Sequence, residues 1–143
     1  MVTMSTDAAG RLANGAINNS GIVRATTLSE HQGVIKLLGG AVKVAGTLDA
    51  SAPSGGDGGF IETSGHTVKV DSSTRVTTAA AYGRTGSWLI DPNDYTIGFG
   101  PSGTDMTGAA LSSLLATTNV TIQMATMGTP GGAGDIFVDA PVS

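Results

Sequence analysis

The chain has 143 residues and a formal net charge of −4, from 7 basic and 11 acidic side chains, with no cluster of Lys or Arg. Binding to nucleic acids or to anionic membranes requires several basic groups on one face, so this charge pattern argues against both partners. The absence of Cys rules out disulfides and Cys-based zinc sites, and the length fits one domain or a slice of a longer protein.

The apolar residues favour a narrow core over a large globular one. The chain has 22 Gly but only 3 Phe, 2 Tyr and 1 Trp, so Val, Ile, Leu and Ala supply most of the apolar surface. Charged residues make up 13% of the chain, against about 25% in ordinary domains. No apolar run approaches the ~20 residues that cross a bilayer, so we expect no membrane insertion. The first five residues show no signal-peptide pattern.

Short runs with β-strand character occupy the first half of the chain. Residues 1–16 are small and mostly polar, and their weak alternation predicts an incomplete first coil. Ile17, Ile22 and Val23 are the next candidate inward positions, beside Asn and Gly residues that favour turns. Further β-rich runs, each bounded by Gly, Ser or Asp, cover residues 33–38, 41–48, 60–63, 67–70 and 75–78. No run–Asn-Gly–run unit recurs between them, which argues against hairpins and favours parallel strands.

An internal repeat sets the expected architecture. The segment GVIKLLGGAVKV at residues 33–44 aligns without gaps on GFIETSGHTVKV at residues 59–70, at an offset of 26 residues. Such a period is typical of solenoids, in which each repeat stacks on the previous one. Stacked coils would place Val42 beside Val68 and Val44 beside Val70, about 4.8 Å apart. The matching lysines, Lys43 and Lys69, would then point outward into water.

The pattern changes after the second copy of the repeat. Residues 52–59 (APSGGDGG) predict a loop that leaves the coil, and this interpretation is favoured over a ligand cradle. Helical spacing predicts one helix near residues 105–116, with Asp105 as N-cap and an inward face of Met106, Ala109, Ala110 and Leu114. Alternation then predicts strands at residues 119–124 and 134–142. The expected organisation of residues 1–143 is a single segment, with coils over 1–98, a loop and helix over 99–119 and a further, truncated coil over 120–143.

A resemblance to a known family rests on the Trp-containing segment. Residues 86–97 (GSWLIDPNDYTI), with GFIETSG at 59–65 before them and the predicted helix after them, resemble the filamentous-haemagglutinin-like family. These are very large bacterial exoproteins and adhesins, often exported by two-partner secretion. The later segments LLATTNVTIQ and GDIFVDAPV, which begin at residues 114 and 134, look like the same block continued. The likeness covers roughly residues 33–143, whereas residues 1–32 fit it loosely.

The resemblance implies a fold and a role. The fold is an all-β, right-handed parallel β-helix (solenoid) of roughly five or six coils with one short side-packed α-helix. The role is structural or adhesive, in a secreted or bacterial cell-surface fibre or biofilm matrix that contacts host-cell or matrix glycans or proteins. The family offers no catalytic residues to carry over. The chain lacks the secretion domain and the anchor of a full-length member, so the resemblance implies an internal segment.

Two motifs suggest chemistry and have simpler interpretations. Residues 98–103 (GFGPSG) match G-x-G-x-x-G, yet no Asp or Glu occurs between Met106 and Gly134, where the ribose-binding carboxylate of a dinucleotide site should lie. We therefore predict no cofactor. Asp91-Pro92 is a chemically labile bond that permits self-cleavage, but these residue types favour a turn, which is the preferred interpretation. The single Trp, Trp88, is predicted to be buried rather than exposed for a ligand.

The remaining candidate groups are carboxylates, histidines and asparagines. The carboxylates available for acid–base chemistry are Asp57, Glu62, Asp71, Asp91 and Asp94, and nothing in their spacing forces any two together. His31 and His66 have no Cys or carboxylate at ligand spacing, so we predict no metal site. Asn18 and Asn119 begin N-x-S/T triplets, which are common by chance in such a chain.

Three functions therefore remain open, and the first is preferred. The chain is predicted to be a rigid structural or adhesive segment that catalyses no reaction. The second hypothesis is self-assembly, because a β-helix exposes unpaired strand edges at its two ends, here near residues 1–16 and 134–143. Its partners would be other copies or flanking coils of the same exoprotein. The third is a carbohydrate-active β-helix enzyme, which requires clustered carboxylates along a groove.

Overall fold

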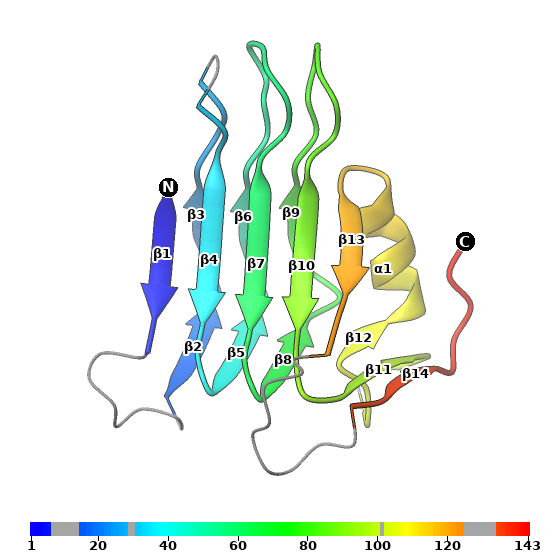
Figure 1. The fold of residues 1–143 in the computed structure, drawn as a ribbon. Coiled ribbons are helices and arrows are strands. Elements are labelled where there is room, and N and C mark those ends of the chain that lie inside the picture. The colour runs from blue at the N-terminus through cyan, green and yellow to red at the C-terminus, as the bar shows by residue number, and fades with distance from the viewer. Residues whose placement is uncertain (7–14, 29–30, 101, 125–133) are drawn as a thin grey trace.

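The computed structural model describes residues 1–6, 15–28, 31–100, 102–124 and 134–143. Over these residues the fold is mostly β, with parallel sheets and one helix (Figure 1). None of the helical segments in this part of the chain has the length and apolar character needed to cross a membrane. The strands are short because the chain turns a corner every few residues.

The largest sheet has five parallel strands and carries the repeat found in the sequence. Its order is β1-β4-β7-β10-β13, and the strands span Val2–Ser5, Val34–Leu38, Phe60–Ser64, Ser87–Asp91 and Asn119–Ile122. Figure 1 shows these five strands side by side, pointing the same way. Neighbouring strands of this sheet therefore differ by three in strand number. The two strands between them in the sequence belong to other sheets.

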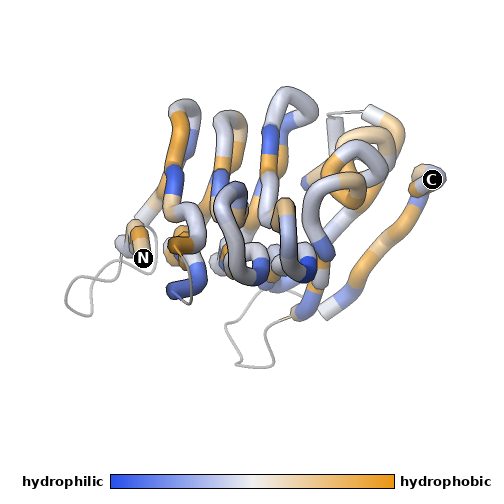
Figure 2. Tube along the Cα trace, turned by 90° about the horizontal axis from the view of Figure 1, so that it is seen from above, coloured by the Kyte–Doolittle hydropathy of each residue, from blue (hydrophilic) through white to orange (hydrophobic). Residues whose placement is uncertain are grey.

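Two three-stranded parallel sheets hold the intervening strands. One has the order β2-β5-β8, with strands at Ala16–Asn19, Ala41–Val44 and Thr67–Val70. The other has the order β3-β6-β9, with strands at Ile22–Arg24, Thr47–Asp49 and Arg75–Thr77. The chain therefore visits the three sheets in turn, and we call each such round a pass. It then returns to the main sheet beside the strand of the previous pass. The view from above in Figure 2 shows these passes lying one beside the next.

The pairing register confirms the repeat predicted from the sequence. Val42 pairs with Val68 and Val44 pairs with Val70 in the β5–β8 ladder, at the offset read from the aligned segments. The same offset relates β4 to β7, where Ile35 pairs with Ile61. Between the two Val pairs, Lys43 pairs with Lys69, and both lysines are exposed to solvent as predicted.

The core lies between the sheets and is narrow. Alternate residues of each strand face inward, so strands such as β4, β7 and β10 share one burial pattern along their length. Trp88 is fully buried, as predicted, and its indole Nε1 donates a hydrogen bond to Thr63 Oγ1 at 3.1 Å. Aliphatic side chains fill most of the remaining core, including Ile35, Leu37, Val42, Val44, Leu48, Ile61, Val68 and Ile90.

Two expectations about the coils were wrong. Residues 41–48 form two strands, β5 and β6, because the chain turns a corner at Ala45 and Gly46. Gly46 fits there because a Cβ on it would lie 2.0 Å from the carbonyl oxygen of Gly21 on the previous pass. Ile22 was expected inward but is 69% exposed, since it pairs with Thr47 on the outer face. Ile17 is buried and Val23 is half-buried.

The last part of the chain departs from the regular stack. Strand β11 (Tyr95–Gly98) lies between β12 (Met106–Thr107) and β14 (Ile136–Val138) in a three-stranded parallel sheet. Met106 was expected to begin the inward face of the helix, but it belongs to β12, where it is buried. The carbonyl of Asp105 accepts a hydrogen bond from Val70 N, which brings the start of β12 against β8.

The helix, α1, spans Gly108–Leu115, two to three residues inside the expected start. Its N-cap is Thr107, whose Oγ1 accepts a hydrogen bond from Ala110 N at 3.2 Å, and not Asp105 as predicted. The carboxylate of Asp105 instead accepts a hydrogen bond from Thr96 N, in β11. Ala110 and Leu114 are buried as expected, whereas Ala109 is exposed.

The remaining strands agree with expectation only in part. The segment that carries the family resemblance contributes β10, Ser87–Asp91, to the main sheet. The last strand covers Ile136–Val138 only, and the following residues 139–143 are not part of a sheet. The first coil was predicted over residues 1–16. Its strand β1 belongs to the main sheet, whereas residues 7–14 lie outside the described part of the chain.

Candidate functional site

Three loops project together beyond the sheets and carry several of the polar contacts between neighbouring passes. Their described residues are 25–28 with 31–33, 50–59 and 78–86, in the connections from β3 to β4, from β6 to β7 and from β9 to β10 (Figure 1, top). We call them the loop ridge. Backbone hydrogen bonds join them, among them Thr27 N to Ser51 O at 2.8 Å and Ala52 N to Ala79 O at 2.9 Å. The loops therefore continue the stacking of the strands and are not independent excursions.

The predicted loop at residues 52–59 is the middle member of this ridge. Gly55 and Gly56 adopt positive φ of 142° and 82°, which explains why the loop needs glycine at its tip. At its base, a Cβ on Gly58 would lie 1.7 Å from the carbonyl oxygen of Thr78 in the next loop. The glycines of this loop thus permit a turn and a close backbone approach, in agreement with the preferred interpretation from the sequence.

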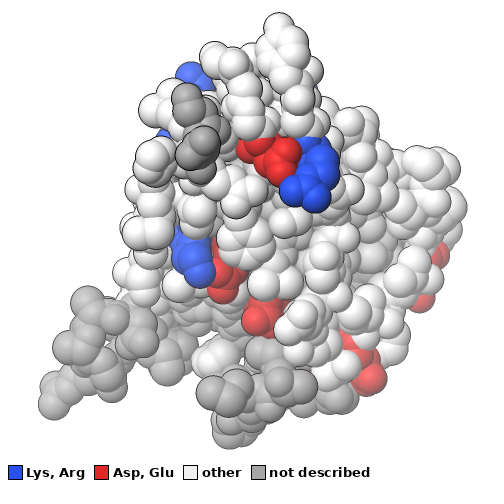
Figure 3. Space-filling model, turned by 45° about the horizontal axis from the view of Figure 1, so that its top comes forward, with Lys and Arg blue, Asp and Glu red and all other residues white. Residues whose placement is uncertain are grey.

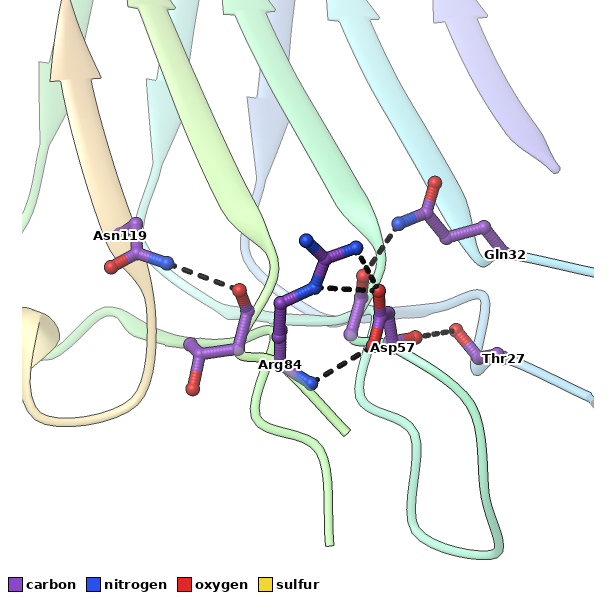
Figure 4. Close-up of polar contacts among 7 residues, drawn as sticks. Thr27, Gln32, Asp57, Arg84 and Asn119 are labelled. Carbon is purple, nitrogen blue, oxygen red and sulfur yellow. Dashed lines mark hydrogen bonds and ion pairs between the residues drawn. The ribbon is translucent and has the colours of Figure 1, made fainter. Parts of the chain in front are cut away.

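A polar cleft of about 270 Å³ lies where the ridge meets the main sheet. Its lining comes from three successive passes of the chain and from the start of β13. The lining residues are Gln32, Asp57, Gly58, Arg84, Thr85, Gly86, Ser87 and Asn119. Figure 4 shows that the labelled side chains among them lie along one line across the strands.

An ion pair occupies the centre of the cleft. The Asp57 carboxylate accepts three hydrogen bonds from Arg84: from the backbone N at 2.9 Å, from Nε at 3.1 Å and from Nη2 at 2.8 Å. The backbone hydrogen bond from Arg84 contributes most to holding the pKa of Asp57 below its ordinary value. Because 89% of the Arg84 side chain is exposed, water screens this pair and its contribution to stability is small.

Side-chain amides and a hydroxyl fasten the neighbouring passes to one another. Gln32 Nε2 donates to Gly58 O at 2.8 Å, and Thr27 Oγ1 donates to Asp57 O at 3.0 Å. At the other end of the cleft, Asn119 Nδ2 donates to Gly86 O at 2.9 Å and to Thr85 O at 3.1 Å, the latter drawn in Figure 4. Each contact joins a side chain of one pass to the main chain of an adjacent pass. These hydrogen bonds therefore hold adjacent passes of the chain together.

The sequence had singled out Asp57 in this cleft but not the residues around it. Gln32 and Arg84 belong to no motif, and the N-x-T triplet at Asn119 does not indicate this contact; the partners of the three side chains lie 26 to 34 residues away in sequence. One signal was available, because Gly33 and Gly59 of the aligned repeat have a third counterpart in Gly86. A three-fold alignment on these glycines would have placed the side chains next to each other.

The candidate carboxylates do not gather into one group. Glu62 and Asp91 are neighbours on the outer face of the main sheet, whereas Asp71 follows β8 and Asp94 precedes β11. Asp71 accepts hydrogen bonds from Ser73, and Asp94 accepts them from the backbone of Gly134 and Asp135. Asp71 thus stabilises the turn after β8, and Asp94 joins the start of β11 to the segment before β14.

The neighbouring pair itself is asymmetric. Glu62 forms an ion pair with Lys36 at 2.7 Å and accepts a hydrogen bond from Ser64 Oγ at 3.1 Å. Asp91 Oδ1 is buried and has no hydrogen-bond partner in the described part of the chain. Burial, and secondly the negative charge of Glu62, raise the pKa of Asp91.

Opposite charges otherwise meet across adjacent passes. Arg24 pairs with Asp49 at 2.8 Å, and it joins Lys36–Glu62 and Arg84–Asp57 in linking neighbouring passes of the chain. The face in Figure 3 is largely uncharged, and the basic groups near its middle lie beside acidic ones. The two exposed lysines, Lys43 and Lys69, line a second cleft of about 210 Å³ together with Asp71 and Asp105.

The histidines and the glycine-rich motif occupy separate places. His31 lies in the ridge, bridged to Leu28, and His66 lies in the turn between β7 and β8. Among the described residues, no three His, Cys, Asp or Glu side chains lie close enough together to hold a metal ion. The G-x-G-x-x-G motif connects β11 to the parallel strand β12, and Pro101 within it lies outside the described residues.

The Asp91-Pro92 bond and the two N-x-S/T asparagines lie in or next to strands. Asp91 ends β10, Pro92 is buried, and the chain bends at Asn93 and Asp94 before β11; Asn93 N donates to His66 O of the previous pass at 3.2 Å. Asn18 and Asn119 are both exposed, but each lies in a strand and the Asn119 amide is already bonded to the ridge.

The chain matches no known protein family, no protein of curated function and no solved structure.

Proposed function

We propose that the chain is a stretch of a right-handed parallel β-helix that serves as a rigid structural and adhesive segment of a large bacterial exoprotein. The segment would be displayed outside the cell, secreted or held at the bacterial surface, and it catalyses no reaction. The observation that carries the proposal is the stepping pattern of the strands. Three parallel sheets receive strands in rotation, and the 26-residue offset pairs Val42 with Val68 in register.

The contacts between stacked passes favour a stiff structural element. Each pass bonds to its neighbours by parallel ladders, by buried side-chain contacts and by the ion pairs and amide contacts that join adjacent passes. In such a one-dimensional stack, bending requires several of these layers to open together. A stiff element with few charges is what a fibre that holds a binding surface away from a cell requires.

The loop ridge is the surface that we assign to adhesion. Two of its apolar side chains point into water: Leu28 is 71% exposed and Tyr82 is 85% exposed. Exposed aromatic groups beside hydrogen-bonding side chains such as Arg84 are typical of surfaces that bind proteins or glycans. The ridge is held on a rigid scaffold, so its side chains are presented with little loss of conformational entropy on binding.

The structural part of the proposal can be tested by limited proteolysis with trypsin. Cleavage requires local opening of the backbone, so Lys36, Lys43 and Lys69, which lie within strands, are expected to resist. Arg84 lies in the ridge and is expected to be cut first. Rapid cleavage at the strand lysines in native buffer would show that the stack is not rigid.

The adhesive part needs a binding assay with a matched aromatic control. Beads coated with the chain are expected to attach to layers of host cells or extracellular matrix, and Tyr82→Ala is expected to reduce attachment several-fold. Phe99→Ala is the control, because Phe99 is 79% exposed but lies between β11 and β12, outside the ridge. Equal loss with both variants, or no attachment above uncoated beads, would restrict the role to a structural one.

A further inference from the structure

One peptide bond combines an attacking group with a good leaving group. Asp91-Pro92 is the only Asp-Pro pair in the sequence. An aspartyl carboxyl is able to attack the main-chain carbonyl of its own residue, because the attack closes a small, unstrained ring. Proline makes the nitrogen of this bond a tertiary amide, which takes up a proton more readily than an ordinary peptide nitrogen does. The two residues therefore supply both halves of a cleavage reaction.

One oxygen of the Asp91 carboxyl has no partner. Asp91 ends β10, and its Oδ1 is buried without a hydrogen bond in the described part of the chain. By contrast, the carboxylates of Asp57 and Asp71 accept hydrogen bonds that fasten them to Arg84 and Ser73. A buried acceptor without a donor raises the free energy of the folded state. No hydrogen bond has to break before Asp91 Oδ1 attacks.

The main-chain atoms of the same bond favour the reaction as well. Asp91 O accepts a hydrogen bond from Gly65 N at 3.1 Å. Negative charge develops on this oxygen when the carbonyl carbon is attacked, and a fixed N–H donor stabilises that charge. Pro92 is buried and has no N–H, so its nitrogen makes no ladder hydrogen bond. Because burial restricts the access of water, we expect the Asp91 carboxyl to supply the proton for this nitrogen.

The protonated carboxyl is the reactive form, because it carries the proton that the leaving nitrogen needs. Burial, and secondly the charge of Glu62, raise the pKa of Asp91, so this form is populated at a higher pH than in an unfolded chain. Glu62 of β7 is itself paired with Lys36 of β4. On the other side Ile122 of β13 carries no charge, and His66, in the turn after β7, is the other titratable residue near this bond.

We propose that the folded chain cleaves itself at the Asp91-Pro92 bond in mildly acidic solution. Asp91 Oδ1 attacks the main-chain carbonyl carbon of its own residue, and the carboxyl proton passes to Pro92 N. The new C–O bond closes a cyclic anhydride at residue 91, and the C–N bond breaks with its electron pair on the proline nitrogen. One water molecule then opens the anhydride, which leaves two carboxyl groups on Asp91 and a free amine on Pro92. Nothing is oxidised or reduced.

The two parts of the cleaved chain stay paired in the stack. Strand β10 ends the first part, and it pairs with β7 of the same part and with β13 of the second. Val70 N in the first part also donates to Asp105 O in the second. The step modifies the chain once and converts no external substrate, so it neither requires nor contradicts the proposed structural role. The products have to be separated under denaturing conditions.

Incubation at about pH 5, followed by mass spectrometry under denaturing conditions, tests the inference. The folded chain is expected to yield fragments of residues 1–91 and 92–143 several-fold faster than the same chain unfolded in urea. Asp91→Asn is expected to abolish these fragments, since an amide has no acidic proton to transfer. Asp71→Asn is the control, because it makes the same change at a carboxylate held by Ser73, and it is expected to cleave at the unmodified rate.

Glu62→Gln separates this reaction from the ordinary acid lability of an Asp-Pro bond. Removing the charge beside Asp91 lowers its pKa, so the cleavage rate is expected to fall several-fold at about pH 5 and to recover at lower pH. Urea denaturation followed by Trp88 fluorescence shows that each variant is folded. The inference is overturned by cleavage as fast in urea as in the folded chain, by an unchanged pH profile in Glu62→Gln, or by the same fragments from Asp91→Asn.

Discussion

At the scale of single residues, a few buried polar contacts fix how the passes sit on one another. Trp88, the largest side chain in the core, donates its indole N–H to the hydroxyl of Thr63 on the previous pass. Thr78 and Thr118 share a short hydrogen bond of 2.6 Å between their hydroxyls, also across two passes. In a core made mostly of aliphatic groups, such contacts favour one register over its neighbours.

We predict that Thr63→Val destabilises the fold by about 1–3 kcal/mol, because it leaves the buried indole N–H without an acceptor. Thr63→Ser keeps the hydroxyl and serves as the control for the hydrogen bond. Urea denaturation followed by Trp88 fluorescence measures both, since the chain has no other Trp. A Thr63→Val variant as stable as the Ser variant would show that the hydrogen bond does not matter for stability.

Asp91 gives the fold a distinct dependence on pH. Its pKa is raised above the ordinary value of 3.8, first by burial and then by the charge of Glu62, so the ionised form disfavours the folded state. The unfolding free energy is therefore expected to rise as the pH falls from neutral through the raised pKa, and this gain is complete near 3.8.

The variant Asp91→Asn removes this ionisation. It is expected to be more stable than the unmodified chain at pH 7, with the difference disappearing as the pH falls toward 4. Below that range Asp49, Asp57 and Asp71 protonate, and the stability that their lowered pKa values provide is lost. Chemical denaturation at several pH values provides the test, and a difference that is independent of pH would contradict the role of the charge.

At the scale of elements, the corners determine where one strand ends and the next begins. Glycines at the corners and loop bases let the backbones of successive passes approach each other closely. Gly58 illustrates this, because its added Cβ would overlap the carbonyl of Thr78 and approach Gly86 N at 2.5 Å. Fewer residue types therefore fit at these glycine positions than at the outward-facing positions of the strands.

We predict that Gly58→Ala destabilises the fold by about 1–3 kcal/mol, the range for forcing extra atoms into a packed site. Gly21→Ala is the control, since a Cβ there would meet nothing within 4 Å. The control is expected to be neutral or slightly stabilising because Ala restricts the unfolded chain more than Gly does. Denaturation midpoints measure both, and equal effects would contradict the close approach at Gly58.

The sequence predicted the repeating elements better than the irregular ones. The gapless alignment of residues 33–44 with 59–70 gave the correct partners for Val42 and Val44, because stacking preserves side-chain phase. The corner at Ala45 and Gly46 was missed because both flanking strands continue the same alternation of apolar residues. Local propensity does not distinguish a bent β segment from a straight one.

The candidate site and the helix start were predicted less well. Arg84 and Asn119 reach their partners only through the stacking of distant loops, which no local pattern encodes. Asp105 has the chemistry of an N-cap, but its carboxylate bonds to Thr96 in β11, and Thr107 caps the helix instead. In both cases a tertiary contact overrides the local preference of the residue.

At the scale of the whole molecule, stability comes from repetition along one direction. No large globular core is present in the described part of the chain, and each pass is covered mainly by the passes on its two sides. The ends consequently differ from the middle, because Met4 and Val138 face inward without cover. The projection of the loop ridge beyond the sheets follows from the same arrangement.

The in-register stacking of successive passes is the central claim, and a disulfide pair tests it most directly. Register partners in adjacent parallel strands lie about 4.8 Å apart, within the reach of a disulfide. The chain has no Cys, so the double variant Lys43→Cys, Lys69→Cys adds the only thiols, both on exposed positions. The control variant Lys43→Cys, Thr67→Cys keeps the same strands and the same face but is displaced by two residues, beyond the limit of about 7 Å.

After mild oxidation, intact mass and mobility on a non-reducing gel measure how much intramolecular disulfide has formed. The account predicts nearly complete closure of the 43–69 pair and little closure of the 43–67 pair. Equal closure of the two pairs, or closure of the displaced pair alone, would contradict the 26-residue register and with it the stack.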